Sequence, residues 1–388
     1  MFRVQVLDAI SSAGLGQFPS ELYLMVSKME NSDAILVRSA ILHGQKFPIS
    51  LKAVGRAGVG VDNIPVEELS RSGVVVFNTP GANANAVKEV VLSCLTAAAR
   101  NIAPAFEFVR NLQGTDEDIK KVLEVGKGQF RGIEIAGKTL GVVGLGAVGG
   151  EVANGALFLG MRVLGFDPDI TVEGAWKLSP QVQPAHSLDE VLSRADFITF
   201  HVPLSATTQN MIDTSRLEKM RDGVIVLNFS REGIVDEAAL ISALDSGKVR
   251  AYVTDFPTSK VKGHPRVSSL PHVGALTQES EENCARMIAQ QVRDFLEDGN
   301  IHNSVNFPEI SLPRSTEFRL VVANVNVPEM IAQITTTVGR AGVNIDNMEN
   351  RHRGNVAYNI LDLDEPVDQF VLRALRRIDG VTMVRAIN

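Results

Sequence analysis

The residues whose types and spacing carry the clearest chemistry lie in the middle of the chain. Residues 142–149 read Val-Val-Gly-Leu-Gly-Ala-Val-Gly, a Gly-x-Gly-x-x-Gly turn between a short apolar strand and a helix. Such glycines permit the tight bend, let the backbone approach a pyrophosphate and let the helix pack closely on the sheet. An acid follows Gly149 by 18 residues, near the offset at which a carboxylate binds a ribose 2′-hydroxyl. The alternative is a glycine-rich turn in a cofactor-free α/β domain. The predicted dinucleotide contacts are Gly144, Gly146, Ala147, Val148, Gly149 and Asp167.

Two further loops place an arginine and a histidine directly after predicted strands. The Arg231 guanidinium can bind a carboxylate through two hydrogen bonds and polarise an adjacent carbonyl; the alternative is an exposed arginine paired with Asp236 or Glu237. His272 lies between a proline and a small-residue turn, where an imidazole can transfer a proton near neutral pH or serve as a structural histidine. Because open α/β sheets bind ligands at the carboxyl ends of their strands, both are candidates for a reaction site.

Three more segments at strand ends are candidates for binding. His201, Val202 and Pro203 form either a cofactor-contacting loop or a structural turn before proline. In the first half, the loop from Gly55 to Asn63 holds three glycines and Arg56. Its backbone N–H groups and fixed charge predict an anion nest; the alternative is a tight turn that places an acid as a cap. The predicted substrate contacts are Arg56, Ala57, Gly58, Val59, Asn78 and Thr79.

The elements that must position these residues follow the βαβ rhythm of parallel sheets. The first series predicts strands at Val4–Leu7, Ala34–Val37, Leu51–Val54 and Val74–Phe77. The second predicts strands at Thr139–Val143, Arg162–Phe166, Phe197–His201, Val224–Asn228, Ala251–Thr254 and Val267–Leu270. Residues 84–111 and 278–298 are each predicted to form one long helix. Residues 115–138 are predicted to form a short helix and an extended basic arm with Lys120, Lys121, Lys127 and Arg131.

The last 73 residues follow a proline-containing linker at 300–315 and have a smaller pattern. Strands are predicted at Phe318–Val325, Val343–Met348, Val356–Leu363 and Val381–Ala386, and helices at Glu329–Arg340 and Val367–Arg377. The order βαββαβ is that of the ferredoxin-like split unit.

Composition narrows the classes of protein to which the chain can belong. With 388 residues it should hold two or three domains, and its net charge of −7 gives no sign of binding to nucleic acid or an anionic membrane. No uncharged apolar run is long enough to span a bilayer. Cys94 and Cys284 are the two cysteines, and we expect both to be buried reduced thiols in a reducing, cytoplasmic compartment, with no metal site.

Taken together, these segments resemble the D-isomer-specific 2-hydroxy-acid dehydrogenases over nearly the whole chain. The motifs that carry the resemblance are Gly55–Asn63, Asn78-Thr79-Pro80, Gly144–Gly149, His201-Val202-Pro203-Leu204, Ser230-Arg231-Glu232-Gly233 and Pro271-His272-Val273-Gly274. The resemblance implies an α/β fold with two Rossmann-like, doubly wound domains and a C-terminal ferredoxin-like domain. The nucleotide domain, 96–279, would be inserted in a substrate domain made of 1–95 and 280–310, with the C-terminal domain at 316–388.

Within the family, the chain most resembles members that oxidise 3-phospho-D-glycerate and carry a C-terminal ACT regulatory domain. That implies NAD as cofactor, oxidation to 3-phosphohydroxypyruvate in L-serine biosynthesis, and a homodimer or homotetramer. Arg231 would hold the carboxylate and carbonyl while His272 moves the proton. The acid at 167 would favour NAD over NADP by repelling a 2′-phosphate. Ser230, Asp255 and Gly274 join the implied cofactor contacts.

The chain departs from the family pattern in one run. The family places a glutamate that pairs with the catalytic histidine in an Asp-x-Phe-x-x-Glu-Pro-like run. Here residues 253–260 read Val-Thr-Asp-Phe-Pro-Thr-Ser-Lys, so that Ser259 or Lys260 stands in its place. A carboxylate partner stabilises an imidazolium and sets its tautomer, and this run supplies none.

The C-terminal domain suggests a possible L-serine effector. The serine-regulated type uses polar residues on the first strand, a Pro-Gly turn and an asparagine after the first helix. Asn324, Asn326 and Asn344 stand at comparable places, whereas Glu329 replaces the glycine.

Other functions stay open: a glyoxylate or hydroxypyruvate reductase of the same family, a non-catalytic NAD-sensing interaction protein, or chiefly a serine sensor. The intact Arg231 and His272 favour an enzyme, and the ACT-like tail and basic arm favour a phosphorylated substrate.

Overall fold

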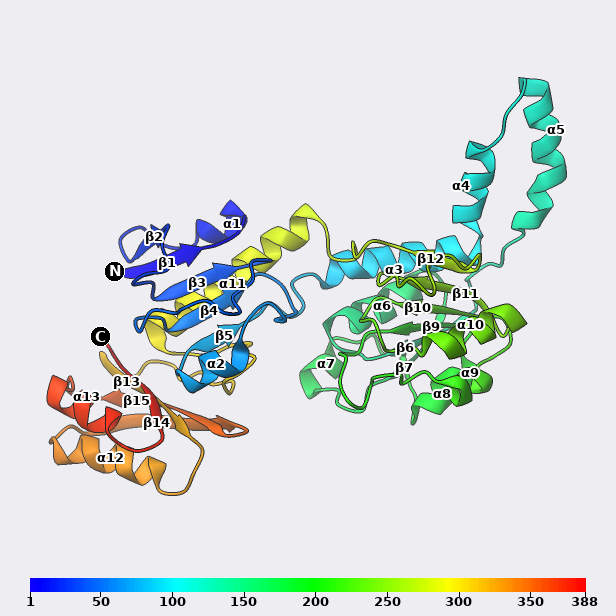
Figure 1. The fold of residues 1–388 in the computed structure, drawn as a ribbon. Coiled ribbons are helices and arrows are strands. Elements are labelled where there is room, and N and C mark those ends of the chain that lie inside the picture. Colours follow the sequence, from blue (N-terminus) through cyan, green and yellow to red (C-terminus); the bar gives the residue numbers. More distant parts are fainter. The chain divides into compact units, whose positions relative to one another are not determined.

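The computed structural model describes residues 1–388 and divides them into two compact units (Figure 1). The first unit joins Met1–Ala82 to Gln278–Asn388, and the second is the continuous segment Asn83–Thr277. The chain thus leaves the first unit before the helix predicted from residue 84, so that this helix belongs wholly to the second unit.

The first unit contains a five-stranded parallel sheet in the order β2-β1-β3-β4-β5. Helix α11 packs on it through apolar side chains that include Ile288, Val292 and Phe295, all fully buried. The close approach of α1 requires a glycine, because a Cβ at Gly14 would lie 2.3 Å from the carbonyl oxygen of Ala285. The elements are β1 (Phe2–Val6), α1 (Ser12–Leu15), β2 (Tyr23–Val26), β3 (Ala34–Val37), β4 (Ala53–Arg56), α2 (Val66–Arg71), β5 (Val75–Phe77) and α11 (Gln278–Asp298).

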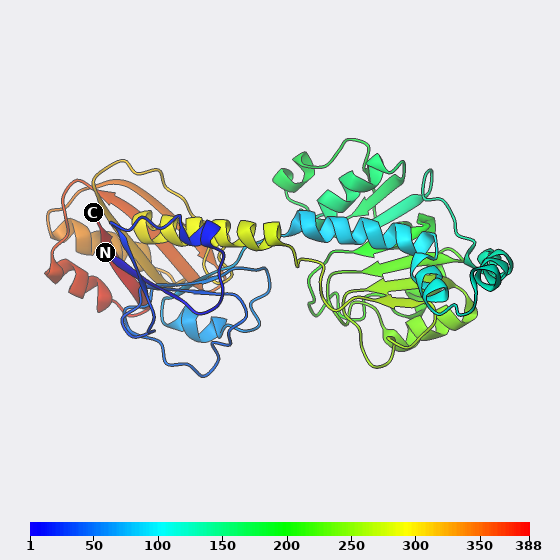
Figure 2. The same ribbon diagram turned by 90° about the horizontal axis from the view of Figure 1, so that it is seen from above.

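The rest of the first unit is a four-stranded antiparallel sheet in the order β14-β15-β13-β16. Helices α12 and α13 cover one face, and residues of the other face, among them Tyr358, share a core with α11. Figure 2 shows α11 as a long yellow helix beside these strands. The elements are β13 (Phe318–Val325), α12 (Met330–Arg340), β14 (Ile345–Arg353), β15 (Val356–Leu363), α13 (Gln369–Arg376) and β16 (Val381–Ile387).

A buried ion pair fastens this second sheet to the end of α11. Arg319 on β13 and Asp362 on β15 are both fully inaccessible and face each other across the two strands. The Arg319 guanidinium also donates to the carbonyl oxygens of Asp298, at 2.9 Å, and Leu312, at 2.9 Å. A buried charge is stable only with such partners, so the pair fixes the linker and the sheet in one arrangement.

The second unit is built on a seven-stranded parallel sheet in the order β12-β11-β10-β9-β6-β7-β8. Strand β6 lies between β7 and β9, which is where the strand order reverses and where such sheets bind ligands. The strands are β6 (Thr139–Val143), β7 (Arg162–Phe166), β8 (Gln183–Pro184), β9 (Phe197–Phe200), β10 (Val224–Asn228), β11 (Val249–Thr254) and β12 (Val267–Ser269). The helices are α3 (Ala84–Ala99), α4 (Ile102–Arg110), α5 (Asp116–Gly126), η1 (Lys127–Phe130), α6 (Ala147–Phe158), α7 (Val172–Trp176), α8 (Leu188–Arg194), α9 (Thr214–Lys219) and α10 (Glu237–Ser246).

The predicted fold class, two Rossmann-like parallel α/β domains with a C-terminal antiparallel α+β domain, is confirmed. The prediction of one long helix over 84–111 was wrong, because α3 ends at Ala99 and α4 starts at Ile102. Pro104 explains the break: in a continuous helix its ring would clash with the carbonyl of residue 100. Asn101 takes the left-handed conformation between the two helices, with φ at 52°.

Helices α4 and α5 form a hairpin that extends away from the seven-stranded sheet of its own unit (Figure 1). A capping box, in which Thr115 and Asp118 satisfy each other's backbone N–H groups, fixes the start of α5. The hairpin exposes large apolar side chains, namely Phe106, Val109, Val122 and Val125. No helix in the structure combines the length and apolar character needed to cross a membrane.

Candidate nucleotide and reaction site

The glycine turn predicted from the sequence lies at the carboxyl end of β6, and its glycines are sterically required. Gly144 has φ at 88°, and a Cβ there would lie 2.6 Å from the carbonyl oxygen of His201. A Cβ at Gly149 would lie only 1.9 Å from the carbonyl oxygen of Gly144. The turn therefore folds back on itself with no room for a side chain at positions 144 and 149.

Gly146 differs from these two glycines because open space surrounds the place of its missing side chain. It is the N-cap of α6, and no side chain caps the helix. The first N–H groups of α6, those of Ala147, Val148 and Gly149, are thus available to an anion beside the turn. A pyrophosphate group fits this environment, so the turn meets the steric and chemical requirements of a dinucleotide site.

Asp167 lies immediately after β7, where the structure holds its carboxylate against the glycine turn. One oxygen, Oδ2, accepts the N–H of Leu145 at 2.8 Å, and the other accepts the N–H of Asp169 at 2.9 Å. A carboxylate oxygen accepts more than one hydrogen bond, so both oxygens keep capacity for a ligand hydroxyl. The acid is therefore fixed beside the phosphate-binding backbone, as the sequence spacing predicts.

The loop after β9 packs directly on the glycine turn. The backbone N–H of His201 donates to the carbonyl oxygen of Val143 at 2.8 Å, and its ring Nε2 lies 3.0 Å from Oγ1 of Thr199. Burial lowers the pKa of His201 to about 3, so that its ring is neutral at physiological pH. Val202 and Pro203 continue the loop. This loop adds an uncharged wall to the site.

The loop after β10 is held by a residue that the sequence analysis did not single out, Asn228. Its side-chain oxygen accepts the backbone N–H of Ser230 at 3.1 Å and the Ser230 hydroxyl at 3.0 Å. Its side-chain amide donates to the carbonyl oxygen of Arg231 at 2.8 Å. Asn228 is 2% exposed, so these three bonds form a rigid frame for the arginine. A polar residue ending an otherwise apolar strand was the signal that could have identified it.

Arg231 is partly exposed at this edge of the sheet. One of its terminal nitrogens, Nη1, donates to the carbonyl oxygen of Ser230 at 2.7 Å. No carboxylate pairs with it, so the alternative of an arginine bound to Asp236 or Glu237 does not hold in this structure. The rest of the guanidinium remains available for a planar anion.

His272 lies on the loop after β12, whose shape Asp255 fixes. The two oxygens of Asp255 accept the backbone N–H groups of Val273, at 2.9 Å, and Gly274, at 2.7 Å. A Cβ at Gly274 would come within 2.9 Å of the nearer oxygen. His272 is exposed and has a left-handed backbone, with φ at 56°. Such a conformation in a residue other than glycine persists only when its surroundings enforce it.

The His272 ring contacts the ring of Phe256, with centroids 4.8 Å apart, and pairs with no carboxylate. Residues 253–260, where the resemblance implies a glutamate, instead contact an acid from another element, Glu237 at the start of α10. Its carboxylate accepts the hydroxyl of Thr258 at 2.6 Å and lies 3.8 Å from Nζ of Lys260. The aromatic contact and the Asp255 clamp on the neighbouring backbone thus hold His272 in place.

The candidate substrate loop belongs to the first unit. Nε of Arg56, at the end of β4, donates to the carbonyl oxygen of Arg38 at 3.1 Å. The side chain of Asn78 donates to the carbonyl oxygen of Val59 at 2.6 Å. The N–H of Thr79 donates to the carbonyl oxygen of Gly58 at 3.0 Å. The hydroxyl of Thr79 is buried without a hydrogen-bond partner. These hydrogen bonds join the backbone of residues 57–59 to the Asn78 loop at one edge of the sheet.

The three asparagines proposed as effector contacts do not meet in one copy of the chain. Asn324 is buried and accepts a hydrogen bond from the side chain of Asn359 at 2.8 Å. Asn326 follows the end of β13 that pairs with Val356, whereas Asn344 precedes the end of β14 that is level with Leu363. Asn326 and Asn344 therefore lie at opposite ends of the sheet. Glu329 has φ at 69°, a conformation that glycine would adopt without strain.

The chain is similar to a known protein family and to many curated proteins. Residues 95–274 match the family model "D-isomer specific 2-hydroxyacid dehydrogenase, NAD binding domain". A D-3-phosphoglycerate dehydrogenase of Methanocaldococcus jannaschii is 34% identical over 352 residues, which is 87% of this chain and 63% of the relative. One of Archaeoglobus fulgidus is 37% identical over 309 residues, 76% of this chain and 55% of the relative. The chain thus spans less than two thirds of the length of these relatives.

Solved structures give the same fold. An NAD+-bound 3-phosphoglycerate dehydrogenase of Entamoeba histolytica has a TM-score of 0.60 and 26% identity, covering 80% of this chain and 99% of that one. Rhodotorula graminis D-mandelate dehydrogenase has a TM-score of 0.67 at 24% identity, covering 80% and 99%, which shows the fold alone. Together with the sterically required glycine turn at the strand-order reversal, these matches show that residues 95–274 form a D-isomer-specific 2-hydroxyacid dehydrogenase NAD-binding domain.

Proposed function

We propose that the chain catalyses the NAD-dependent oxidation of 3-phospho-D-glycerate to 3-phosphohydroxypyruvate, a step of L-serine biosynthesis. The observation that carries this proposal is the placement of Arg231 and His272 on carboxyl-end loops of the sheet that holds the glycine turn. The names of the relatives at 34% and 37% identity support the phosphorylated substrate.

The proposed mechanism assigns one task to each residue. Arg231, oriented by the Asn228 frame, binds the substrate carboxylate and the C2 oxygen. His272 accepts the proton of the C2 hydroxyl as the carbonyl forms. A dinucleotide held by the glycine turn and Asp167 would supply the hydride acceptor for C2. In the first unit, Arg56 and the backbone of Ala57–Val59 offer positive charge and N–H donors that suit an anionic group.

The substrate is tested by comparing steady-state turnover of 3-phospho-D-glycerate and unphosphorylated D-glycerate with NAD, and reduction of hydroxypyruvate and glyoxylate with NADH. We expect kcat/KM to favour the phosphorylated acid by about 10–100-fold, the range that one or two charge-assisted hydrogen bonds supply. A preference for glyoxylate or hydroxypyruvate would identify a reductase instead. Tight NADH binding without turnover of any of these acids would identify a non-catalytic sensor.

Cofactor selectivity provides a second test, directed at Asp167. We expect Asp167→Ala to raise the affinity for NADPH relative to NADH about tenfold, because a carboxylate that repels the 2′-phosphate is lost. The ratio of the two dissociation constants is measured by titration of reduced-cofactor fluorescence. Asp169→Ala is the matched control, because Asp169 contacts the Asp167 carboxylate through its backbone N–H, which the variant keeps. An unchanged ratio in Asp167→Ala would remove Asp167 from the ribose site.

We also propose that the chain forms a homo-oligomer through the α4–α5 hairpin. The support is its exposed Phe106, Val109, Val122 and Val125, which gather on an element that extends away from its own sheet.

A further inference from the structure

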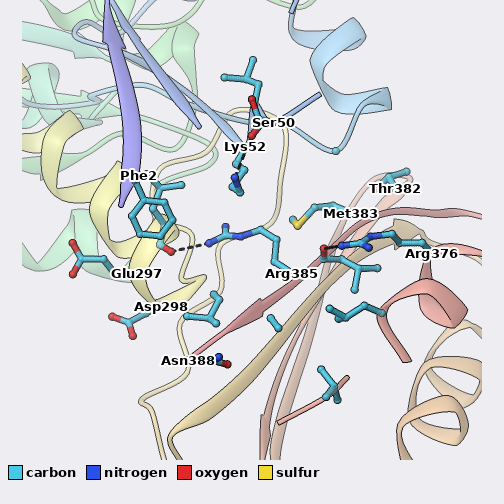
Figure 3. A pocket seen from close by; sticks show the side chains of 18 of the residues that line it. Phe2, Ser50, Lys52, Glu297, Asp298, Arg376, Thr382, Met383, Arg385 and Asn388 are labelled. Atoms are coloured by element: carbon cyan, nitrogen blue, oxygen red, sulfur yellow. Dashed lines mark hydrogen bonds between the residues drawn. The ribbon is translucent and has the colours of Figure 1, made fainter. Parts of the chain in front are cut away.

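The C-terminal sheet meets the rest of the first unit at two places. The first is a cavity of about 1220 Å³ at the amino ends of the parallel strands, where Arg385 on β16 is only 9% exposed. Its guanidinium donates to the carbonyl oxygens of Phe295, at 3.3 Å, and Leu296, at 2.7 Å, on α11. In Figure 3 this side chain extends from β16, and a dashed line marks one of these bonds. Together with Arg319, it anchors the C-terminal sheet on α11.

The second place is the free side of β5, which the β14–β15 hairpin reaches. Strand β5 is the last strand of its sheet, and residues 303–306 cover its outer side through an antiparallel bridge between Phe77 and Ser304. Arg353 is the last residue of β14, and its pairing with Val356 places it at the hairpin turn. Its Nη1 donates to the carbonyl oxygen of Ser304 at 2.7 Å. The tip of the C-terminal sheet thus contacts the segment that covers β5.

Residues 303–306, the covering segment, are bound to β5 by their own hydrogen bonds. The Ser304 hydroxyl donates to the carbonyl oxygen of Val76 at 3.0 Å, and the N–H of Val305 donates to the same oxygen at 2.9 Å. The side-chain oxygen of Asn306 accepts the N–H of Val76 at 2.8 Å. Because these bonds converge on one residue of β5, the covering segment and the end of the strand share one arrangement.

The covering segment also touches the candidate substrate loop. The carbonyl oxygen of Asn303 accepts the backbone N–H of Asn78 at 3.4 Å, and the Asn78 side chain donates to the carbonyl oxygen of Val59 at 2.6 Å. A row of hydrogen bonds therefore runs from the C-terminal hairpin to the candidate substrate loop. The bond between Asn303 and Asn78 is long, so a small shift of the covering segment would break it.

The covering segment has anchors besides Arg353, so that loss of the arginine should not unfold it. The Glu309 carboxylate accepts the N–H of Asn303 at 3.0 Å. The Phe307 ring packs on the Tyr358 ring of β15, with centroids 6.1 Å apart, and both side chains are fully buried. Arg353 therefore adjusts where the segment lies and does not decide whether it forms.

We propose that Arg353 is a positioning residue for the candidate substrate loop. From the tip of the C-terminal sheet it holds the backbone at Ser304, keeps the covering segment against Asn78 and so sets the place of residues 57–59. The inference rests on the proposed function, in which this loop suits an anionic group of the substrate. Arg353 is otherwise exposed, so its expected effect is that of one net hydrogen bond to a carbonyl.

Hydrogen exchange of the full chain tests the contact without the need for turnover. In Arg353→Met we expect the peptides that hold residues 76–80 and 303–307 to exchange about 3–10-fold faster, because their hydrogen bonds open more often. Arg351→Met is the matched control: it replaces an exposed arginine of the same strand that pairs with Glu349 instead of the covering segment. Arg353→Lys keeps a charged donor and should lie near the wild type.

Steady-state kinetics then separates positioning of the loop from support of the fold. We expect Arg353→Met to raise KM for 3-phospho-D-glycerate about 3–10-fold and to change kcat less than about twofold, because Arg231 and His272 are untouched. The inference is overturned if both peptides exchange as they do in Arg351→Met, or if exchange quickens while KM keeps its wild-type value. Absence of turnover in the wild type would contradict the proposed function instead, and exchange would still decide whether Arg353 holds the loop.

Discussion

Arg231→Gln is expected to lower kcat/KM for the 2-hydroxy acid by about 100–1000-fold, the effect of removing one preorganised donor at a reacting oxygen. Glutamine keeps a hydrogen-bonding group at the position but loses the charge and the planar fork that grips a carboxylate. Asn228 binds the backbone carbonyl of residue 231 and not its side chain, so the loop should keep its shape in the variant. Steady-state kinetics with 3-phospho-D-glycerate and NAD measures the loss.

NADH binding separates this effect from a collapse of the site. Its dissociation constant should change little in Arg231→Gln, because the glycine turn and Asp167 are independent of the guanidinium. Arg162→Gln is the matched control, an exposed arginine at the start of β7 with no side-chain partner, and should retain wild-type turnover. Near-normal kcat/KM in Arg231→Gln would refute the proposed role of the arginine.

The sequence was most informative where a local steric requirement decides the structure. Strands at Thr139–Val143, Arg162–Phe166 and Val224–Asn228 were predicted with the bounds that the structure has, because each is a compact apolar run. The glycine turn follows the first of these, and the positions of Gly144 and Gly149 admit no side chain. These features depend on neighbouring residues alone.

Features that depend on long-range packing were harder to predict. Strand β8, at Gln183–Pro184, contains only two residues and exists because it pairs with β7, and β2 exists because β1 pairs with it. The role of Asp255 as a clamp on the His272 loop requires contact with residues 18 and 19 positions away. The hydrogen bond from Thr258 to Glu237 likewise joins a loop to the start of α10, 21 residues away. No pattern of neighbouring residues encodes such pairings.

The end of helix α3 was predicted wrongly, although the sequence contains the residue that sets it. Pro104 forbids a continuous helix across residue 100, although the residues on both sides of it favour a helix. A proline inside a helical pattern therefore marks a helix boundary.

His272→Asn is expected to lower kcat by about 100–10,000-fold, the range over which a positioned acid–base group acts. Asparagine is the suitable replacement because it tolerates the left-handed backbone at this position, with φ at 56°, better than glutamine does. The variant therefore removes proton transfer without adding backbone strain. The clamp from Asp255 binds backbone N–H groups only and should survive, so NADH affinity should stay near the wild-type value.

Rescue by an added base separates proton transfer from positioning. Added imidazole should restore part of the activity of His272→Asn, because it supplies the missing base, and should leave the wild-type rate unchanged. His186→Asn, which replaces an exposed histidine of the same unit, should behave like the wild type. Turnover of His272→Asn near the wild-type rate would assign the base to another residue and leave the ring as a structural element that contacts Phe256.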